Sequence, residues 1–184
     1  MARKQGVTPE LDKLSCDLMG QAFDLLAEGK DVEPMLAVQD AAGHTASYEF
    51  VDDGIEACIE GAHDKVGELV SAGGDPKADL ATPVRYAIVY EGAIEDEDGA
   101  YEDAVLLEFG EEGYEAYSAY SLFKGRGEHE KFAWTDPAPA GELEPLIKAA
   151  EFTWSLALRH IVTSSSTIFA SVNPLNGLKT ARSG

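Results

Sequence analysis

The sequence predicts one α+β domain, in which an antiparallel sheet of about five strands carries helices mainly on one face. Two stretches repeat apolar residues at intervals of three or four positions, as amphipathic helices do. Residues 84–123 contain three short runs rich in β-branched and aromatic residues, separated by glycines or acidic residues. Short connections join these runs, so we expect an antiparallel meander with one face built for burial.

The first helix is predicted to begin at Thr8-Pro9-Glu10. Threonine is a favoured N-cap residue, proline suits the first helical position, and an acidic side chain in the first turn interacts favourably with the helix dipole. Apolar residues recur at helical spacing from Leu11 to Leu26, and Gly29 is expected to end the helix. This face of the helix should pack on the core.

The strands are expected in two groups. Residues 34–50 are predicted to form a β-hairpin, with the sequence Asp-Ala-Ala-Gly as the turn at residues 40–43. The second group is the meander, and residues 131–134 are expected to add another strand. In the first strand of the meander, Val84, Tyr86 and Ile88 share one face.

A second helix is predicted between the two groups of strands. Asp52 or Asp53 can cap its start, and it should run to about Ala72. Its apolar residues form one stripe. Gly61 and Gly67 interrupt this helix, and each costs about 1 kcal/mol relative to alanine. We therefore expect them where the helix packs closely against a neighbour.

The chain changes composition after the meander. Two prolines and a glycine in residues 136–141 are expected to end the sheet. Residues 142–162 have the apolar spacing of a third helix, and a Ser/Thr-rich, basic tail follows. We therefore divide the chain into an acidic α+β domain, residues 1–147, and a C-terminal helix with a flexible tail, residues 148–184.

The predicted order is helix, two strands, helix, three or four strands, helix. In this order the chain resembles the roadblock and profilin-like folds over about residues 8–160. The resemblance is one of topology, without a shared residue motif. It implies a homo-oligomeric regulatory or structural domain that pairs through a sheet edge or a helix face.

Net charge is the most unusual property of the chain, because 34 acidic and 14 basic residues give −20. Residues 148–184 contain four basic residues and one acidic residue, a net +3, so residues 1–147 carry −23. Such a surface repels nucleic acids and anionic membranes, and it either attracts basic partners or serves solubility alone. We expect no nucleic acid and no membrane among the partners.

The location of the protein is expected to be cytoplasmic. No run approaches the ~18 consecutive apolar residues of a membrane-spanning helix. The basic N-terminal residues are not followed by the apolar segment of a secretory signal. Cys16 and Cys58 fall inside predicted helices, so we expect two buried thiols and no disulfide.

Metal and catalytic sites have weak support in the sequence. Glu56, Glu60 and His63 share one helix face with the Glu-x-x-His spacing of di-iron bundles, but such a site needs a second copy of the motif and two further glutamates. The solvated face of an amphipathic helix explains the same pattern. Neither the four histidines nor the two cysteines have the spacing of a zinc site. We expect no metal and no cofactor, and no catalytic residue is identified.

Residues 95–99, Glu-Asp-Glu-Asp-Gly, resemble part of a calcium-binding EF-hand loop. With Gly99 at the sixth position of such a loop, Ile94 occupies the first position and Val105 the twelfth, where acidic ligands are required. We therefore interpret this segment as a polar hairpin loop.

Tyrosines on the meander are the candidate interaction residues. Tyr117 is expected to face opposite to Tyr114 and Tyr120, so aromatic side chains lie on both faces of the sheet. Exposed tyrosines are typical of protein interfaces, whereas cross-strand aromatic pairs that only stabilise the sheet are the alternative. The full candidate set is Tyr86, Tyr90, Tyr114, Tyr117 and Tyr120.

Three functional hypotheses follow. The leading one is a non-catalytic acidic protein-interaction module, for example of the immunity or inhibitor type, that binds a basic protein. The second is a homo-oligomeric domain of roadblock-like architecture, whose partner is a second copy. The third is a metal-dependent enzyme that uses Glu56, Glu60 and His63, which meet the requirements of such a site poorly.

Removal of the tail tests the predicted division of the chain. A protein truncated after Val162 should keep its melting temperature within about 2 °C, because Ser/Thr-rich terminal segments contribute little to a core. Thermal unfolding of the full and truncated chains measures this. A larger loss would show that the tail packs on the domain.

Overall fold

The computed structural model describes residues 2–51 and 54–149. The chain divides into two compact units, residues 1–149 and 150–184, and the second unit lies outside the described residues. The predicted tail, and the predicted third helix beyond residue 149, therefore also lie outside them. Within the described part, no helix is both long and apolar enough to cross a membrane.

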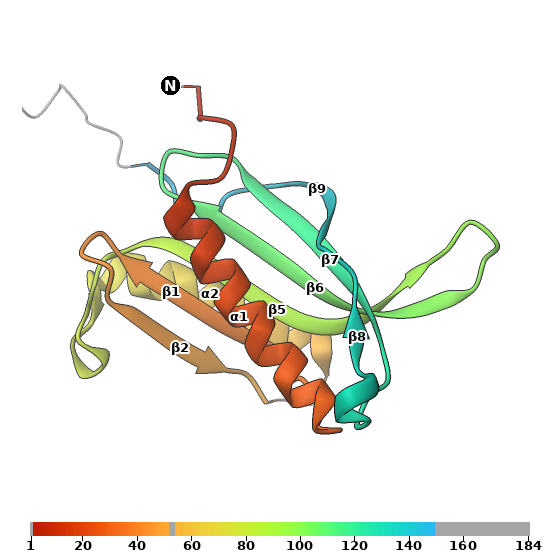
Figure 1. Cartoon of the computed structure of the whole chain (residues 1–184). Coiled ribbons are helices and arrows are strands. Elements are labelled where there is room, and N and C mark those ends of the chain that lie inside the picture. Colours follow the sequence, from red (N-terminus) through yellow and green to blue (C-terminus); the bar gives the residue numbers. More distant parts are fainter. Residues whose placement is uncertain (1, 52–53, 150–184) are drawn as a thin grey trace, which may run out of the picture. The chain divides into compact units, whose positions relative to one another are not determined.

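The described part is an α+β structure with two α-helices and a large antiparallel sheet (Figure 1). The elements in chain order are α1 (Pro9–Ala27), β1 (Met35–Asp40), β2 (Thr45–Glu49), α2 (Ile55–Ala72), β3 (Gly74–Asp75), η1 (Pro76–Ala78), β4 (Leu80–Ala81), β5 (Pro83–Glu95), β6 (Tyr101–Glu111), β7 (Ala116–Lys124), η2 (His129–Lys131), β8 (Ala133–Trp134) and β9 (Ala138–Leu143).

The start of α1 confirms the predicted cap. The Thr8 side-chain oxygen accepts a hydrogen bond from the Leu11 amide at 3.2 Å, and Pro9 is the first helical residue. The helix ends at Ala27, and Gly29 then adopts a positive φ of 79°, a conformation that favours glycine.

The sheet has seven strands in the order β2-β1-β5-β6-β7-β8, with β9 also paired to β7. The predicted hairpin β1–β2 and the meander β5–β6–β7 are both present, and β8 pairs Trp134 with Phe123. The strand that follows α2, β5, pairs with β1 and not with β2. The expectation of about five strands is therefore too low, chiefly because of β8 and β9.

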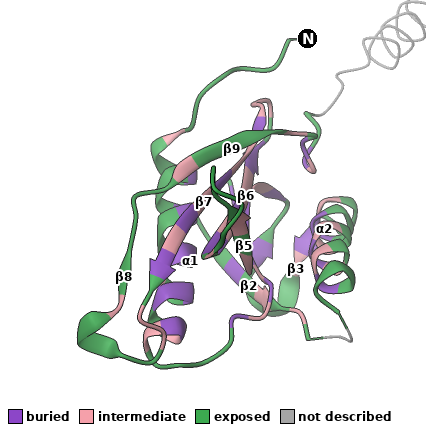
Figure 2. Ribbon diagram, turned by 90° about the vertical axis from the view of Figure 1, so that its right-hand side faces the viewer, coloured by how far each residue is buried: buried purple, intermediate pink, exposed green. Residues whose placement is uncertain are grey.

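The expectation that helices lie mainly on one face of the sheet is wrong. Figure 2 shows the sheet between α1 and α2. Ala87 and Val89 of β5 pack in the cluster that contains α1, whereas Tyr86 and Ile88 pack in the cluster that contains α2. Both alternating sets of side chains in β5 are apolar, so each face needs its own helix to exclude water.

The expectation that residues 136–141 end the sheet is also wrong, because β9 pairs with β7 from Ala116↔Leu143 to Tyr120↔Ala138. Pro139 fits this strand because, among the described strands, β9 pairs with β7 alone and is an edge strand. A proline lacks the backbone N–H, which an edge strand does not need on its unpaired side. The start of the predicted third helix, from Glu142, belongs to β9 and to an irregular segment that follows.

The second helix starts at Ile55 with Gly54 as N-cap, and Asp52 and Asp53 lie outside the described residues. A Cβ atom on Gly61 would lie 3.3 Å from the Phe50 ring, which confirms close packing there. Gly67 has no atom within 4 Å of the same position, so the packing explanation is wrong for it.

The two cysteines differ in their surroundings. Cys58 is buried, as expected, whereas Cys16 of α1 is exposed, which corrects the expectation of two buried thiols. Neither forms a disulfide. Cys16 lies one residue beyond the buried Ser15, at the edge of the face that α1 turns towards the sheet.

A polar network joins the start of α1 to the sheet. The Thr8 hydroxyl donates to Glu111 Oε2 at 2.5 Å, and Glu111 Oε1 lies 2.9 Å from Arg85 Nη2. Arg85 Nη1 donates to Gln39 Oε1 at 3.1 Å. These four residues connect α1, β1, β5 and β6, and Glu111 is buried with its charge compensated by Arg85.

Thr8→Ala should therefore destabilise the domain by about 1–2 kcal/mol, because it removes the N-cap and one partner of a buried carboxylate. Thr8→Ser is the matched control: it keeps the hydroxyl and should change the free energy of unfolding by less than about 0.5 kcal/mol. Urea unfolding of both variants measures the difference. Equal losses would show that the methyl group, and not the hydroxyl, stabilises the helix start.

Candidate functional site

The predicted metal candidates are not brought together. His63 of α2 lies 2.7 Å, Nε2 to Oε2, from Glu108 of β6, and Tyr90 of β5 donates to the other oxygen of Glu108 at 3.0 Å. Glu56 and Glu60 are exposed on α2. Among the described residues, no three His, Cys, Asp or Glu side chains gather in a way that could hold a metal ion.

This cluster has shifted pKa values. The hydrogen bond to Glu108 raises the pKa of His63. Burial acts to raise the pKa of Glu108, but the hydrogen bond and the charge of His63, together with the Tyr90 hydroxyl, lower it overall. Burial and the nearby Glu108 charge raise the pKa of Tyr90 well above its usual range, so this phenol stays protonated. The arrangement joins α2 to the sheet.

The acidic segment at residues 95–99 forms the tip of the β5–β6 hairpin, as predicted, and Figure 1 shows this hairpin extending beyond the rest of the sheet. Asp96 Oδ1 accepts hydrogen bonds from the amides of Asp98 and Ala100, at 2.9 and 2.8 Å. One carboxylate therefore shapes the loop itself.

The five candidate tyrosines have different environments. Tyr86 is 1% exposed, packed between the sheet and α2, so it is not a surface residue. The Tyr90 hydroxyl donates a hydrogen bond to Glu108. The Lys4 ammonium lies over the Tyr114 ring, 5.3 Å from its centroid. Tyr117 and Tyr120 are both half-buried and lie on opposite faces of β7.

The largest apolar depression among the described cavities lies beside Tyr117, and we call it the Tyr117 groove. Its volume is about 510 Å³. The Tyr117 ring lies 6.1 Å from that of Phe109, its partner in the β6–β7 register. The groove is lined by Gly6, Val7, Phe109, Tyr117, Ser118, Ala119, Pro137, Pro139, Gly141 and Glu142.

A smaller cavity of about 100 Å³, the inner chamber, shares four of these residues and reaches α1. It is lined by Val7, Asp12, Ser15, Cys16, Met19, Leu107, Phe109, Ala119 and Pro137. Among the residues that line the two cavities, the sequence predicts only Tyr117 as an interaction residue. From the sequence, the two prolines predict only the end of the sheet, although proline is also suited to an edge strand.

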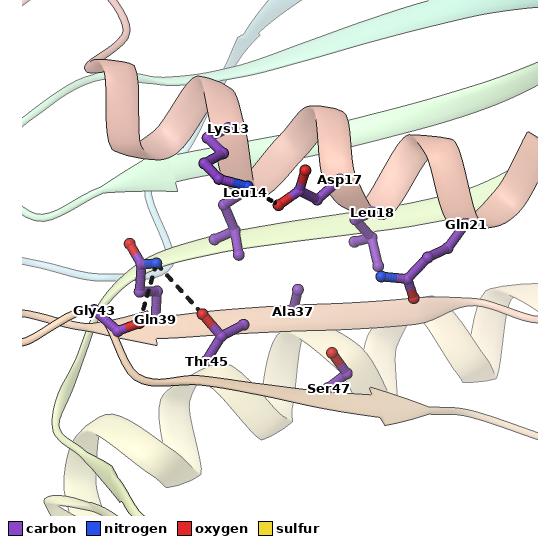
Figure 3. A pocket seen from close by; sticks show the side chains of 10 residues that line it. All are labelled: Lys13, Leu14, Asp17, Leu18, Gln21, Ala37, Gln39, Gly43, Thr45 and Ser47. Atoms are coloured by element: carbon purple, nitrogen blue, oxygen red, sulfur yellow. Dashed lines mark hydrogen bonds and ion pairs between the residues drawn. The ribbon is translucent and has the colours of Figure 1, made fainter.

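A third cavity, of about 300 Å³, lies between α1 and the β1–β2 hairpin (Figure 3). Four of its polar side chains bind one another: Lys13 pairs with Asp17 at 2.5 Å, and Gln39 donates to Thr45 at 3.3 Å. This cavity therefore presents fewer unpaired groups to a ligand than its residue types suggest.

Comparisons of the chain with protein-family models, curated proteins and solved structures found no match.

The His63–Glu108 contact should make stability depend on pH. The pKa of His63 is raised from 6.5, so its contribution is full below pH 6.5 and is lost as the pH rises through the folded value. The pKa of Glu108 is lowered from 4.5, so its contribution is present above pH 4.5 and is lost as the pH falls through the folded value. Both contributions to stability are therefore fully present between pH 4.5 and pH 6.5.

His63→Gln should accordingly cost more stability at about pH 5.5 than at about pH 9, by up to about 1 kcal/mol after allowance for solvent screening of the partly exposed ring. Urea unfolding of both proteins at the two pH values measures this difference. An equal loss of stability at the two pH values would mean that the charge of the His63 ring does not contribute to the free energy of unfolding.

Proposed function

We propose that the protein is a non-catalytic interaction module that binds a basic segment of another protein at the Tyr117 groove. The observation that carries the proposal is the groove itself. It is a depression with a volume of about 510 Å³, lined by aromatic and proline side chains. The protein that carries it is otherwise strongly acidic. Apolar depressions surrounded by polar residues are typical of binding surfaces.

The aromatic pair suits the role of an anchor. Tyr117 is half-buried, with Phe109 behind it and its hydroxyl accepting a hydrogen bond from the Gly6 amide at 3.3 Å. The ring is therefore held in place before a partner arrives, and less side-chain freedom is lost on binding. Tyrosines of this kind supply a large part of the affinity at many interfaces.

Charge supports a basic partner. Of the ten lysines and arginines in residues 1–147, eight have a carboxylate within 4.0 Å in the described structure. The remaining negative charge, −23 in total over this range, is available to attract cations from outside. The same field opposes association between two copies of the chain.

A homo-oligomeric function is the second candidate, favoured by one observation. Strand β2 ends the described sheet on one side, and its sequence, Thr-Ala-Ser-Tyr-Glu, contains no proline that would block pairing. On the opposite side, β9 contains Pro139 and directly follows Pro137. A second copy could therefore extend the sheet at β2 only by overcoming the charge repulsion.

Affinity capture followed by binding kinetics tests the leading proposal. Tyr117→Ala should lower the affinity of the protein for the recovered partner at least about tenfold, as expected for the loss of an interface anchor. Tyr120→Ala is the matched control, because Tyr120 is also half-buried on β7 but faces the other side of the sheet.

The salt dependence tests the charge argument separately. Association should slow between about 20 and 200 mM salt, with a smaller change in dissociation. Unchanged affinity in Tyr117→Ala would exclude the groove as the interface. A salt-independent association rate would mean that the acidic surface serves solubility.

A further inference from the structure

We propose that the Tyr117 groove binds an arginine side chain of the partner, whose guanidinium group stacks on the Tyr117 ring and pairs with the Glu142 carboxylate. The inference rests on the proposed function, and it names the residue type by which the groove recognises a basic segment. Tyr117 and Glu142 both line the groove.

A row of three side chains on neighbouring strands is the first observation. Phe109 of β6 is the register partner of Tyr117 of β7, and Tyr117 is the register partner of Glu142 of β9. Residues directly opposite each other in antiparallel strands share one face of the sheet, with their Cβ atoms about 4.5–5.5 Å apart. Tyr117 therefore has an aromatic neighbour on one side and a carboxylate neighbour on the other.

The Glu142 carboxylate is the second observation, because it has no cation of its own. Glu142 is exposed, and its side chain forms no ion pair or hydrogen bond with any described residue. The acidic side chains next to this row, Glu115 and Glu144, both pair with Arg3 at 3.7 Å. The described part of the chain thus neutralises these two carboxylates and leaves Glu142 open to a cation from a partner.

The Tyr117 hydroxyl is the third observation. It accepts a hydrogen bond from the Gly6 amide at 3.3 Å, at an exposed position, and its own hydrogen has no acceptor among the described residues. A phenol both donates and accepts, so this O–H group can donate to a main-chain carbonyl of the partner. Tyr117 therefore offers its ring to the side chain and its hydroxyl to the backbone of one bound residue.

A guanidinium group suits this combination. It is planar and stacks on aromatic rings, where a cation within about 6 Å of the ring centroid is attracted by the π-system. Its N–H groups also match the two oxygen atoms of a carboxylate. Because Tyr117 and Glu142 are cross-strand neighbours, one guanidinium can contact both.

Other ligand classes fit the same groups less well. An acidic side chain would be repelled by Glu142, and an aliphatic side chain over the row would take water from the carboxylate without replacing its hydrogen bonds. A lysine ammonium can pair with Glu142, but it is a compact point charge without a planar face to stack on the ring.

Titration of the full chain with N-acetyl-arginine amide, followed by the amide NMR signals of Tyr117, Ser118 and Glu142, tests the inference. The arginine probe should shift these signals with a dissociation constant of about 1–10 mM. N-acetyl-citrulline amide has nearly the same shape without the charge and should bind at least about fivefold more weakly. N-acetyl-lysine amide should bind at least about twofold more weakly, because it cannot stack.

Three variants make the test specific. Glu142→Gln should lower the affinity for the arginine probe at least about fivefold, to the level of the citrulline probe. Glu144→Gln is the matched control: it removes the same charge from an exposed glutamate that is already paired with Arg3, and should change the affinity by less than about twofold. Tyr117→Phe keeps the ring and should keep the preference for arginine over citrulline.

Equal binding of the arginine and citrulline probes would overturn the inference, as would equal effects of Glu142→Gln and Glu144→Gln. Equal binding of the arginine and lysine probes would overturn the choice of arginine. If the arginine probe does not shift these signals while Tyr117→Ala still lowers the affinity for the partner, the inference fails and the proposed function stands. If Tyr117→Ala leaves the affinity for the partner unchanged, the proposed function fails and the inference fails with it.

Discussion

Burial of β5 on both faces is the constraint on which the rest of the structure depends. Tyr86, Ala87, Ile88 and Val89 are consecutive and each is at most 1% exposed. Side chains of a strand alternate between the two faces, so neither face of the sheet centre can meet water. One helix must cover each face, and α2 therefore passes to the side opposite α1 before the chain returns as β5 beside β1.

The same constraint explains where the groove lies. The buried cluster under α1 includes Leu107 and Ala119, whereas Phe109 is only partly buried beside it and Tyr117 lies outside it. The N-terminal segment and β9 approach this uncovered part with Val7, Pro137 and Pro139. Apolar side chains thus line a depression because a single helix is narrower than the sheet.

Polar groups in the interior divide into satisfied and unsatisfied sets. Glu111 is bonded to both Thr8 and Arg85, and Glu108 to both His63 and Tyr90. These contacts join each helix to the sheet, on opposite faces. Ser15 Oγ and Arg85 Nε differ from them, because both atoms are buried and neither has a hydrogen-bond partner among the described residues.

The sequence by itself determined the features that depend on neighbours a few residues away. The Thr8-Pro9 helix start, the turn at residues 40–43 and the strands of the meander all follow from local backbone preferences, and the structure contains each of them. Tertiary structure alone decided that Tyr86 is buried and that residues 138–143 form a strand. It also decided that His63 meets Glu108, 45 residues away, and not Glu60. These outcomes depend on which strand lies beside which and which helix covers each face, and long-range packing sets both, so no short window of sequence contains them.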